Sequence, residues 1–400
     1  MYASMWVFPW DLADEGIEEA LLRIRDEAGI QCISVAASYD AGKLLLPHNP
    51  KRKVYFPEEG VIYFQPLPAW YAGLELQPQV SKICRERNLL REVTDVAQRL
   101  GMDVVAWTVC CHNSRLAAQN LNCAIVNCFG DYYITNLCPA NEQVRAYVLA
   151  MIGDLLTNYP LHAIELESVE YMPFQHSYHH EKIEIELPPL IEFLLGLCFC
   201  RACEERARAR GIDVVAVRSI VRNEVQRFFD APGRYPRESV TWERVVNRLG
   251  REVEGYLLTR TSTITSFLSA ICDSVKQRGQ TRVHLFGDVH PGNLWQVGID
   301  PNELAQLADS VIVLAYRSSI SELNSALIVN RHILRGRANL IIGLHPSEKY
   351  SGSLDGFKER VRLCCARGAD GISFFNYGLL ARYHLSWIKQ ALSEATAVSS

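Results

Sequence analysis

The stretch from 162 to 182, HAIELESVEYMPFQHSYHHEK, places two carboxylates inside an apolar run and follows them with a cluster of histidines. Glu165 and Glu167 stand in the apolar part, where an unpaired charge is costly. Side chains alternate along a strand, so Ile164 and Leu166 share one face and the two glutamates share the other. If the apolar pair packs against helices, both carboxylates point inward, away from the helices. Glu167 is the nearer of the two to the carboxyl end of the strand.

Paired carboxyl groups across one sugar ring are the chemistry that hydrolyses a glycosidic bond. One protonates the leaving oxygen, and the other attacks the anomeric carbon or activates water. The strand-like run VHLFGD ends at Asp288, and its alternation puts this carboxylate on the inward face. We therefore predict Glu167 as nucleophile and Asp288 as acid/base, with Glu165 as a further catalytic candidate. A structural ion pair is the alternative interpretation of each acid.

Polar and aromatic residues near the ends of the strand-like runs could hydrogen-bond to sugar hydroxyls or stack on sugar rings. The loop HSYHHE carries three histidines and a glutamate, a composition that suits either sugar binding or a solvated surface. The predicted substrate-binding residues are Tyr39, Asp40, His48, His112, His176, His179, His180, Glu181, His290, Tyr316, His345 and Tyr377. Core packing explains the aromatic members of this set equally well.

Metal binding is the second chemistry that these residue types allow. The loop pattern H-x-x-H-H-E does not match the H-E-x-x-H zinc motif, so we predict no metal in the catalytic site. Farther along, CFCRAC brings Cys198, Cys200 and Cys203 close together and could bind zinc with a fourth ligand. No second C-x2-C knuckle is visible, and the alternative is that these thiols pack as small hydrophobic groups.

Short apolar runs alternate with amphipathic segments along the whole chain, which favours parallel strands joined by helices. The expected strands are 31–37, 103–109, 123–127, 162–168, 282–287, 310–316, 339–344 and 371–376. The expected helices are 14–28, 141–158, 321–335, 354–367 and 382–394. We predict an α/β fold, specifically a (β/α)8 TIM barrel. An open doubly wound sheet is the alternative, but neither G-x-G-x-x-G nor a P-loop is present.

Two connections are too long for simple βα units, so we predict one elaborated barrel over 1–400 with large insertions after strands 1 and 4. The first insertion, 38–102, contains an expected hairpin over 52–64 with its turn at Pro57–Gly60. The second insertion, 169–281, reads as mostly helical. Both follow the carboxyl end of a strand, where barrel enzymes build their sites, so we expect them to form the walls of a cleft.

Charge, apolar runs and cysteine content indicate which kinds of partner and compartment to expect for this protein. The net charge of -4 gives no basic field for nucleic acid, and no apolar run is long enough to span a membrane. The amino-terminal residues lack the pattern of a signal peptide. Thirteen cysteines, several of them in apolar runs, favour free thiols in a reducing compartment, so we expect a cytoplasmic protein. The expected partner is a carbohydrate, and the oligomeric state stays open, a homo-oligomer included.

Several segments resemble glycosyl-hydrolase-like TIM-barrel proteins. LCPANEQVRAYVLAMIGDLLTNYPLHAIELESVEYMPF is similar to a run in which NP-x-VR-x-Y opens a helix and DGI-H-L-D-Y-x-R-Y-P forms the next strand. LCFCRACEERARARGID, ADSVIVLAY and GADGISFFNYG are similar to later segments of the same proteins. The resemblance implies a glycoside hydrolase or close relative, with Glu167 at the position of the acidic strand residue. The motif's Asp is Glu167 here, its His is Glu165 and its Arg is Glu170.

The sequence thus predicts a glycoside hydrolase that acts through two carboxylates. One alternative is a metal-dependent sugar isomerase or epimerase on the same barrel, with Glu167, Asp288, His290 and His345 as ligands. A non-catalytic carbohydrate-binding barrel is the other alternative.

Overall fold

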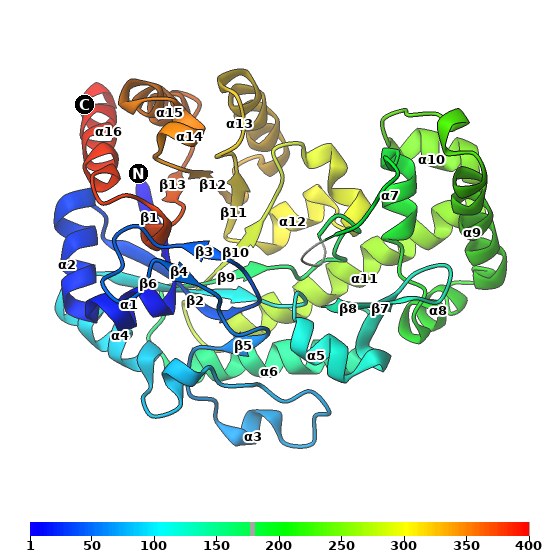
Figure 1. The fold of residues 1–400 in the computed structure, drawn as a ribbon, viewed down its shortest axis with the longest axis horizontal. Helices are drawn as coiled ribbons and strands as arrows, with labels where there is room; N and C mark the ends of the chain where they lie inside the picture. The colour runs from blue at the N-terminus through cyan, green and yellow to red at the C-terminus, as the bar shows by residue number, and fades with distance from the viewer. Residues whose placement is uncertain (177–180, 400) are drawn as a thin grey trace.

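Eight parallel strands close into a barrel at the centre of the computed structural model, which describes residues 1–176 and 181–399 (Figure 1). In order around the barrel they are β1 (Tyr2–Val7), β2 (Cys32–Tyr39), β6 (Asp103–Val109), β9 (Ala163–Glu167), β10 (Arg282–Phe286), β11 (Ser310–Leu314), β12 (Asn339–Leu344) and β13 (Gly371–Phe374). Pairing of β1 with both β2 and β13 closes the ring. The predicted (β/α)8 fold is therefore confirmed.

Helices surround the strands and cover their outward faces (Figure 1). The main ones around the barrel are α1 (Pro9–Glu15), α2 (Ile17–Ala28), α4 (Leu89–Arg99), α6 (Glu142–Asn158), α12 (Pro301–Leu307), α13 (Ile320–Leu334), α15 (Leu354–Ala366) and α16 (His384–Ser399). The five expected helices are present, but the first is divided. Gly16, with φ 92°, ends α1 and precedes α2, because this positive φ is readily adopted only by glycine.

One expected barrel strand was wrong. The segment 123–127 contains β7 (Ala124–Val126), which pairs antiparallel with β8 (Tyr132–Leu137) outside the barrel. The missing barrel strand is β1, at the amino terminus. Its apolar pattern is interrupted because Ser4 faces the barrel interior, where its hydroxyl meets that of Ser373 at 2.5 Å. The first predicted insertion, 38–102, therefore follows the second barrel strand, and the other follows the fourth.

The expected hairpin over 52–64 was also wrong. Its first half, β4 (Val54–Tyr55), pairs with β3 (Leu44–Leu45). Its second half, β5 (Val61–Ile62), instead adds antiparallel to the end of β2. Between them, the Glu58 carboxylate accepts hydrogen bonds from the Ser81 hydroxyl at 2.9 Å and from the Lys82 N–H at 2.7 Å. These bonds hold the expected turn against a later part of the insertion. The two strands that flank the turn, β4 and β5, therefore pair with other strands and not with each other. Two short helices, α3 (Pro68–Tyr71) and α5 (Ser114–Gln119), lie farther along the chain.

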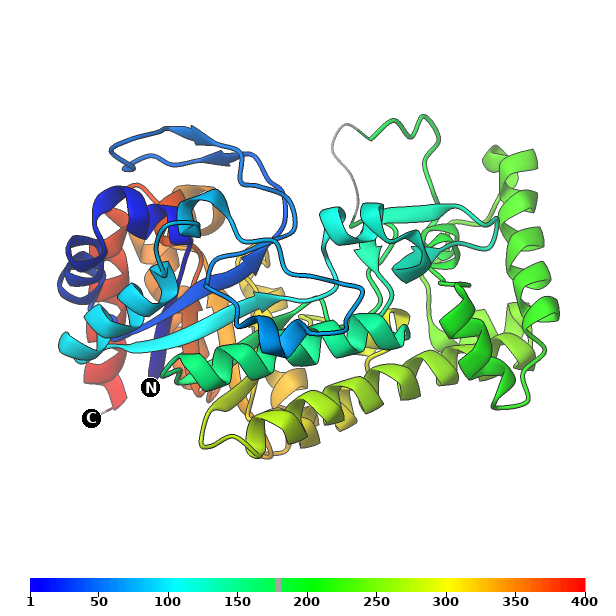
Figure 2. The same ribbon diagram turned by 90° about the horizontal axis from the view of Figure 1, so that it is seen from below.

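The second insertion is mostly helical, as predicted, and extends to one side of the barrel (Figure 2). It contains α7 (Pro189–Leu195), α8 (Arg201–Arg208), α9 (Val214–Asp230), α10 (Trp242–Leu249) and α11 (Arg251–Lys276). The long helix α11 lies beside α6 and connects the insertion to the barrel. No helix in the described residues is both long and apolar enough to cross a membrane.

Helix α6 begins at a side-chain cap, Asn141. The Asn141 side chain accepts the N–H of Gln143 at 2.8 Å and that of Val144 at 3.4 Å. Replacing Asn141 with Ala should lower the free energy of unfolding by about 1 kcal/mol, because it leaves these N–H groups without their acceptor. Denaturant unfolding measures the loss. Asn141→Asp is the matched control, since it keeps the acceptor and loses only the bond from Nδ2 to the Asn122 carbonyl. Equal losses in the two variants would contradict the capping role.

Candidate functional site

Glu167 lies at the carboxyl end of β9, at the mouth of the barrel. Its Oε2 accepts a hydrogen bond of 2.5 Å from the indole Nε1 of Trp107 on β6. Burial raises the pKa of Glu167, while the Trp107 hydrogen bond and the nearby His112 act in the opposite direction. Burial raises the pKa values of Tyr39, the last residue of β2, and of Tyr316, just after β11, and the charge on Glu167 raises both further. Groups from several strands therefore converge on this carboxylate.

Glu165 lies deeper in the barrel, as strand alternation predicts. It accepts a short hydrogen bond from the indole Nε1 of Trp6 on β1, which confirms that it points inward. Only 1% of Glu165 is exposed, and burial raises its pKa to about 8. The carboxyl is thus mostly protonated at neutral pH, and it has no exposed edge to meet a substrate. The structure places this catalytic candidate beneath the mouth.

Glu170 is the carboxylate that sequence reasoning left out of the site. Beyond β9, the Cys110 and Cys111 N–H groups bond at 2.8 Å to the carbonyls of Glu167 and Ser168. Ser168 then adopts φ 58°, in the left-handed region, and this turn ends the regular alternation. Glu170 is partly exposed, and its pKa is raised to about 7 by burial and, in addition, by the charge of Glu167. The two carboxyls therefore interact electrostatically.

Asp288 lies after β10, as predicted, beside a cavity of about 420 Å³. Its Oδ1 accepts the backbone N–H of His290 at 2.6 Å. The cavity lies between the helical insertion and the chain after β10, and Glu192 on α7 and Arg260 on α11 also line it. Asp288 therefore belongs to the same end of the barrel as Glu167. The pairing of these two as nucleophile and acid/base stays a prediction.

A chain of hydrogen-bonded groups reaches the site from β2. Asp40 Oδ2 lies 3.0 Å from His112 Nε2, and His112 Nδ1 lies 3.2 Å from His176 Nε2. Burial opposes ionisation of Asp40, but hydrogen bonds from His112 and Ser114 outweigh it and lower the pKa. Burial and the neighbouring His112 lower the pKa of His176 to about 4. Three predicted substrate-binding residues are thus brought together, and one of them, His112, is close enough to Glu167 to act on its pKa.

Aromatic rings surround the mouth near these carboxyls. Phe375 stacks on Tyr316 with ring centroids 5.6 Å apart, and its ring lies 6.4 Å from that of Trp107. His345, after β12, lies 4.6 Å from the Tyr350 ring, and burial lowers the pKa of this histidine to about 4. Tyr316, His345 and Phe375 are each partly exposed. Rings in this arrangement can stack on the apolar face of a sugar.

Other predicted substrate-binding residues lie elsewhere. Tyr377 is 0% exposed and donates a hydrogen bond of 2.8 Å to Glu15, whose other oxygen lies 2.8 Å from His48 Nδ1. This network joins the end of β13 to α1, so the structure does not bring Tyr377 to the mouth. His290 and Glu181 are exposed. The two remaining histidines of the loop, His179 and His180, lie outside the described residues.

The ligands of the isomerase alternative do not assemble. Within 1–176 and 181–399, only one group of three or more His, Cys, Asp or Glu side chains has ligand atoms close enough to share a metal ion. That group consists of four cysteines. Glu167, Asp288, His290 and His345 therefore give no assembled metal site in this part of the chain.

Comparisons with known proteins agree with the fold. No protein-family model matches this sequence, and no curated protein matches it. The glycoside hydrolase domain of PgaB (BpsB) from Bordetella bronchiseptica matches 99% of this chain and 98% of its own, with TM-score 0.61 and 11% identity. Alpha-L-fucosidase isoenzyme 2 from Paenibacillus thiaminolyticus matches 100% of this chain, with TM-score 0.57 and 12% identity; this chain spans 50% of its length. The resemblance to glycosyl-hydrolase-like TIM barrels is therefore confirmed at the level of the fold.

The buried carboxyl of Glu165 makes stability depend on pH. Its pKa is about 8 in the folded chain against an ordinary 4.5, so between these values the folded state holds a proton that the unfolded state has lost. The stabilisation from this proton is complete below about pH 4.5 and disappears as the pH rises through about 8. Relative to Glu165→Gln, the wild type should lose on the order of a few kcal/mol over this range. Denaturant unfolding across a pH series measures this difference, and a difference that does not change with pH would contradict it.

Proposed function

We propose that this protein is a glycoside hydrolase in which Glu167 and Glu170 act on the glycosidic bond. The observation that carries the proposal is the placement of two partly exposed carboxyls at the end of β9, Glu167 as its last residue and Glu170 just beyond the turn at Ser168; burial raises the pKa of both. Buried carboxyls with perturbed pKa values cluster at functional sites. The likeness to two glycoside hydrolases adds support from fold analogy alone.

Glu170 is the proposed general acid. A pKa of about 7 keeps a large fraction of this carboxyl protonated near neutral pH, ready to give its proton to the leaving oxygen. Glu167 is the proposed nucleophile or base, since the Trp107 hydrogen bond and His112 both favour its ionised form. In the reaction, the proton of Glu170 passes to the glycosidic oxygen as the bond to the anomeric carbon breaks. Glu167 attacks that carbon or removes a proton from the attacking water.

The rest of the mouth suits a carbohydrate. Tyr39 and Tyr316 offer polar atoms and ring surfaces near Glu167, and His345 lies beside Phe375 in the same group of rings, a composition typical of sugar sites. The neighbouring cavity, with Asp288, Glu192 and Arg260 in its walls, offers room for further sugar units. Asp288 is the competing candidate for the acid/base, carried forward from the strand pattern.

Substitution of Glu167 and of Glu170 separates the roles of these two acids. Glu167→Gln should lower turnover by about 10²–10⁴-fold on every substrate of the enzyme. Glu170→Gln should lower it as strongly on glycosides with a poor leaving group. It should have a much smaller effect on the bond-breaking step of aryl glycosides with an acidic leaving group, because such a group departs without a proton. Initial rates on both substrate types, with Glu205→Gln as the matched surface control, measure this pattern.

Two outcomes would contradict the assignment. If Asp288→Asn shows the leaving-group dependence and Glu170→Gln does not, Asp288 is the acid. If the native chain binds oligosaccharides but turns none over, and Glu167→Gln binds them equally well, the protein is a non-catalytic carbohydrate-binding barrel.

The pH profile gives a separate test of Glu170. A general acid works in its protonated form, so kcat/KM should fall as the pH rises through about 7, where Glu170 loses its proton. Residual activity of Glu170→Gln should lack this alkaline limb. A profile of the same shape in wild type and Glu170→Gln would show that another group controls it.

A further inference from the structure

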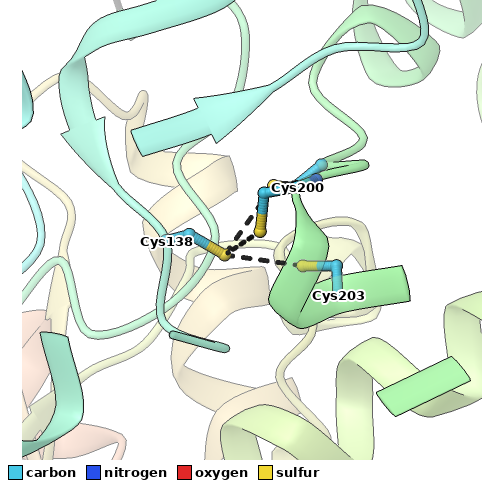
Figure 3. A group of neighbouring side chains, drawn as sticks. Cys138, Cys200 and Cys203 are labelled. Carbon is cyan, nitrogen blue, oxygen red and sulfur yellow. Dashed lines mark hydrogen bonds between the residues drawn. The ribbon is translucent and has the colours of Figure 1, made fainter. Parts of the chain in front are cut away.

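Four cysteines from two distant segments meet inside the protein. Cys138 follows β8, and Cys198, Cys200 and Cys203 come from the start of α8 and the chain before it. The Cys138 sulfur lies 3.4 Å from that of Cys203, 3.5 Å from that of Cys200 and 3.7 Å from that of Cys198. All four sulfurs lie within 4.8 Å of one another, and all four residues are buried. Figure 3 shows Cys138 facing the C-x-C-x2-C segment.

The geometry is that of a tetrahedral thiolate site. Zinc binds cysteine sulfur at about 2.3 Å, so a tetrahedral ion holds its sulfurs about 3.8 Å apart. A disulfide would bring two sulfurs to about 2.05 Å, and none of these cysteines is bonded in that way. Packing as small hydrophobic groups requires each thiol to be buried, but it does not require four of them to converge. Cys138 is the fourth ligand that the sequence pattern lacked.

The surroundings of the sulfurs favour thiolates. The N–H groups of Val126 and Cys200 each point to the Cys198 sulfur at 3.5 Å. Cys200 is the N-cap of α8 and Cys203 lies in its first turn, where the helix dipole favours negative charge. The Tyr171 hydroxyl lies 3.5 Å from the Cys203 sulfur. Donors of this kind around the ligands orient and stabilise a metal-bound thiolate.

We propose that Cys138, Cys198, Cys200 and Cys203 bind one structural Zn²⁺ ion. Each thiol releases one proton to solvent as its sulfur binds the metal, so a single Zn²⁺ replaces four protons and leaves a Zn(S–Cys)4 centre with charge 2−. The site belongs to the loops beyond the barrel strands and does not depend on the proposed hydrolase activity.

The ion joins two connections that are separate in sequence. Cys138 belongs to the chain between β6 and α6, and the other three ligands belong to the helical insertion. The same two segments already meet through the Phe199 N–H, which bonds to the Val126 carbonyl at 2.6 Å. Tyr171, which touches Cys203, directly follows Glu170 in the chain. The metal therefore fixes the base of the insertion and the segment that leaves the candidate site.

Metal analysis of the full-length protein tests the proposal directly. The chain, purified without added metal or chelator, should contain one zinc per molecule by elemental analysis. X-ray absorption at the zinc edge should give four sulfur neighbours at about 2.3 Å. A mercurial reagent should release this zinc as it reacts with the cysteines. Protein without zinc, with iron in its place, or with disulfides among these four residues by mass spectrometry would overturn the proposal.

A matched pair of variants identifies the ligands. Cys138→Ser should lose most of the zinc and lower the melting temperature. Cys364→Ser removes an equally buried thiol on α15 and should keep one zinc per chain. Full zinc content in Cys138→Ser would overturn the role of Cys138. If that variant does not fold, the zinc content and sulfur coordination of the wild type still decide the question.

Discussion

Carboxylates inside the barrel need hydrogen-bond donors, and two tryptophans supply them. The Trp6 indole from β1 reaches Glu165, and the Trp107 indole from β6 reaches Glu167. A buried carboxyl without such partners would carry the full cost of desolvation. These two bonds therefore allow β9 to carry acids on its inward face, and they link it to its neighbour β6 and, across the barrel, to β1. The chemistry proposed at the mouth depends on these hydrogen bonds, because they allow the strand that carries Glu167 to keep buried carboxyls in the barrel.

The same constraint divides the acids by depth. Glu165 is enclosed beneath the mouth, is mostly protonated at neutral pH, and has a structural role in the barrel interior. Glu167, one layer higher, keeps an exposed edge and interacts with groups in or just after three different strands, β2, β6 and β11. Glu170 lies beyond the turn at Ser168, where burial and, in addition, the charge of Glu167 raise its pKa. Environment, more than residue type, separates a structural carboxyl from a reactive one.

Strand alternation predicted the inward face of β9 and the place of Glu167 correctly, because a period of two is a local property. It missed β1, since inward Ser4 breaks the apolar run that identifies a buried strand. It also missed Glu170, because serine seldom adopts a left-handed backbone conformation and the sequence therefore gives no sign of the turn at Ser168. Cys138 stayed unassigned for a different reason. Its partners lie some 60 residues away, and only the fold brings the two segments together.

The central claim is that Glu167 and Glu170 face one glycosidic bond. The most direct test is a crystal structure of Glu167→Gln with an intact oligosaccharide bound at the barrel mouth. The account predicts that the Glu170 carboxyl lies within about 3 Å of the glycosidic oxygen, with residue 167 beside the anomeric carbon. An oligosaccharide whose glycosidic oxygens all lie beyond the reach of both side chains would contradict it.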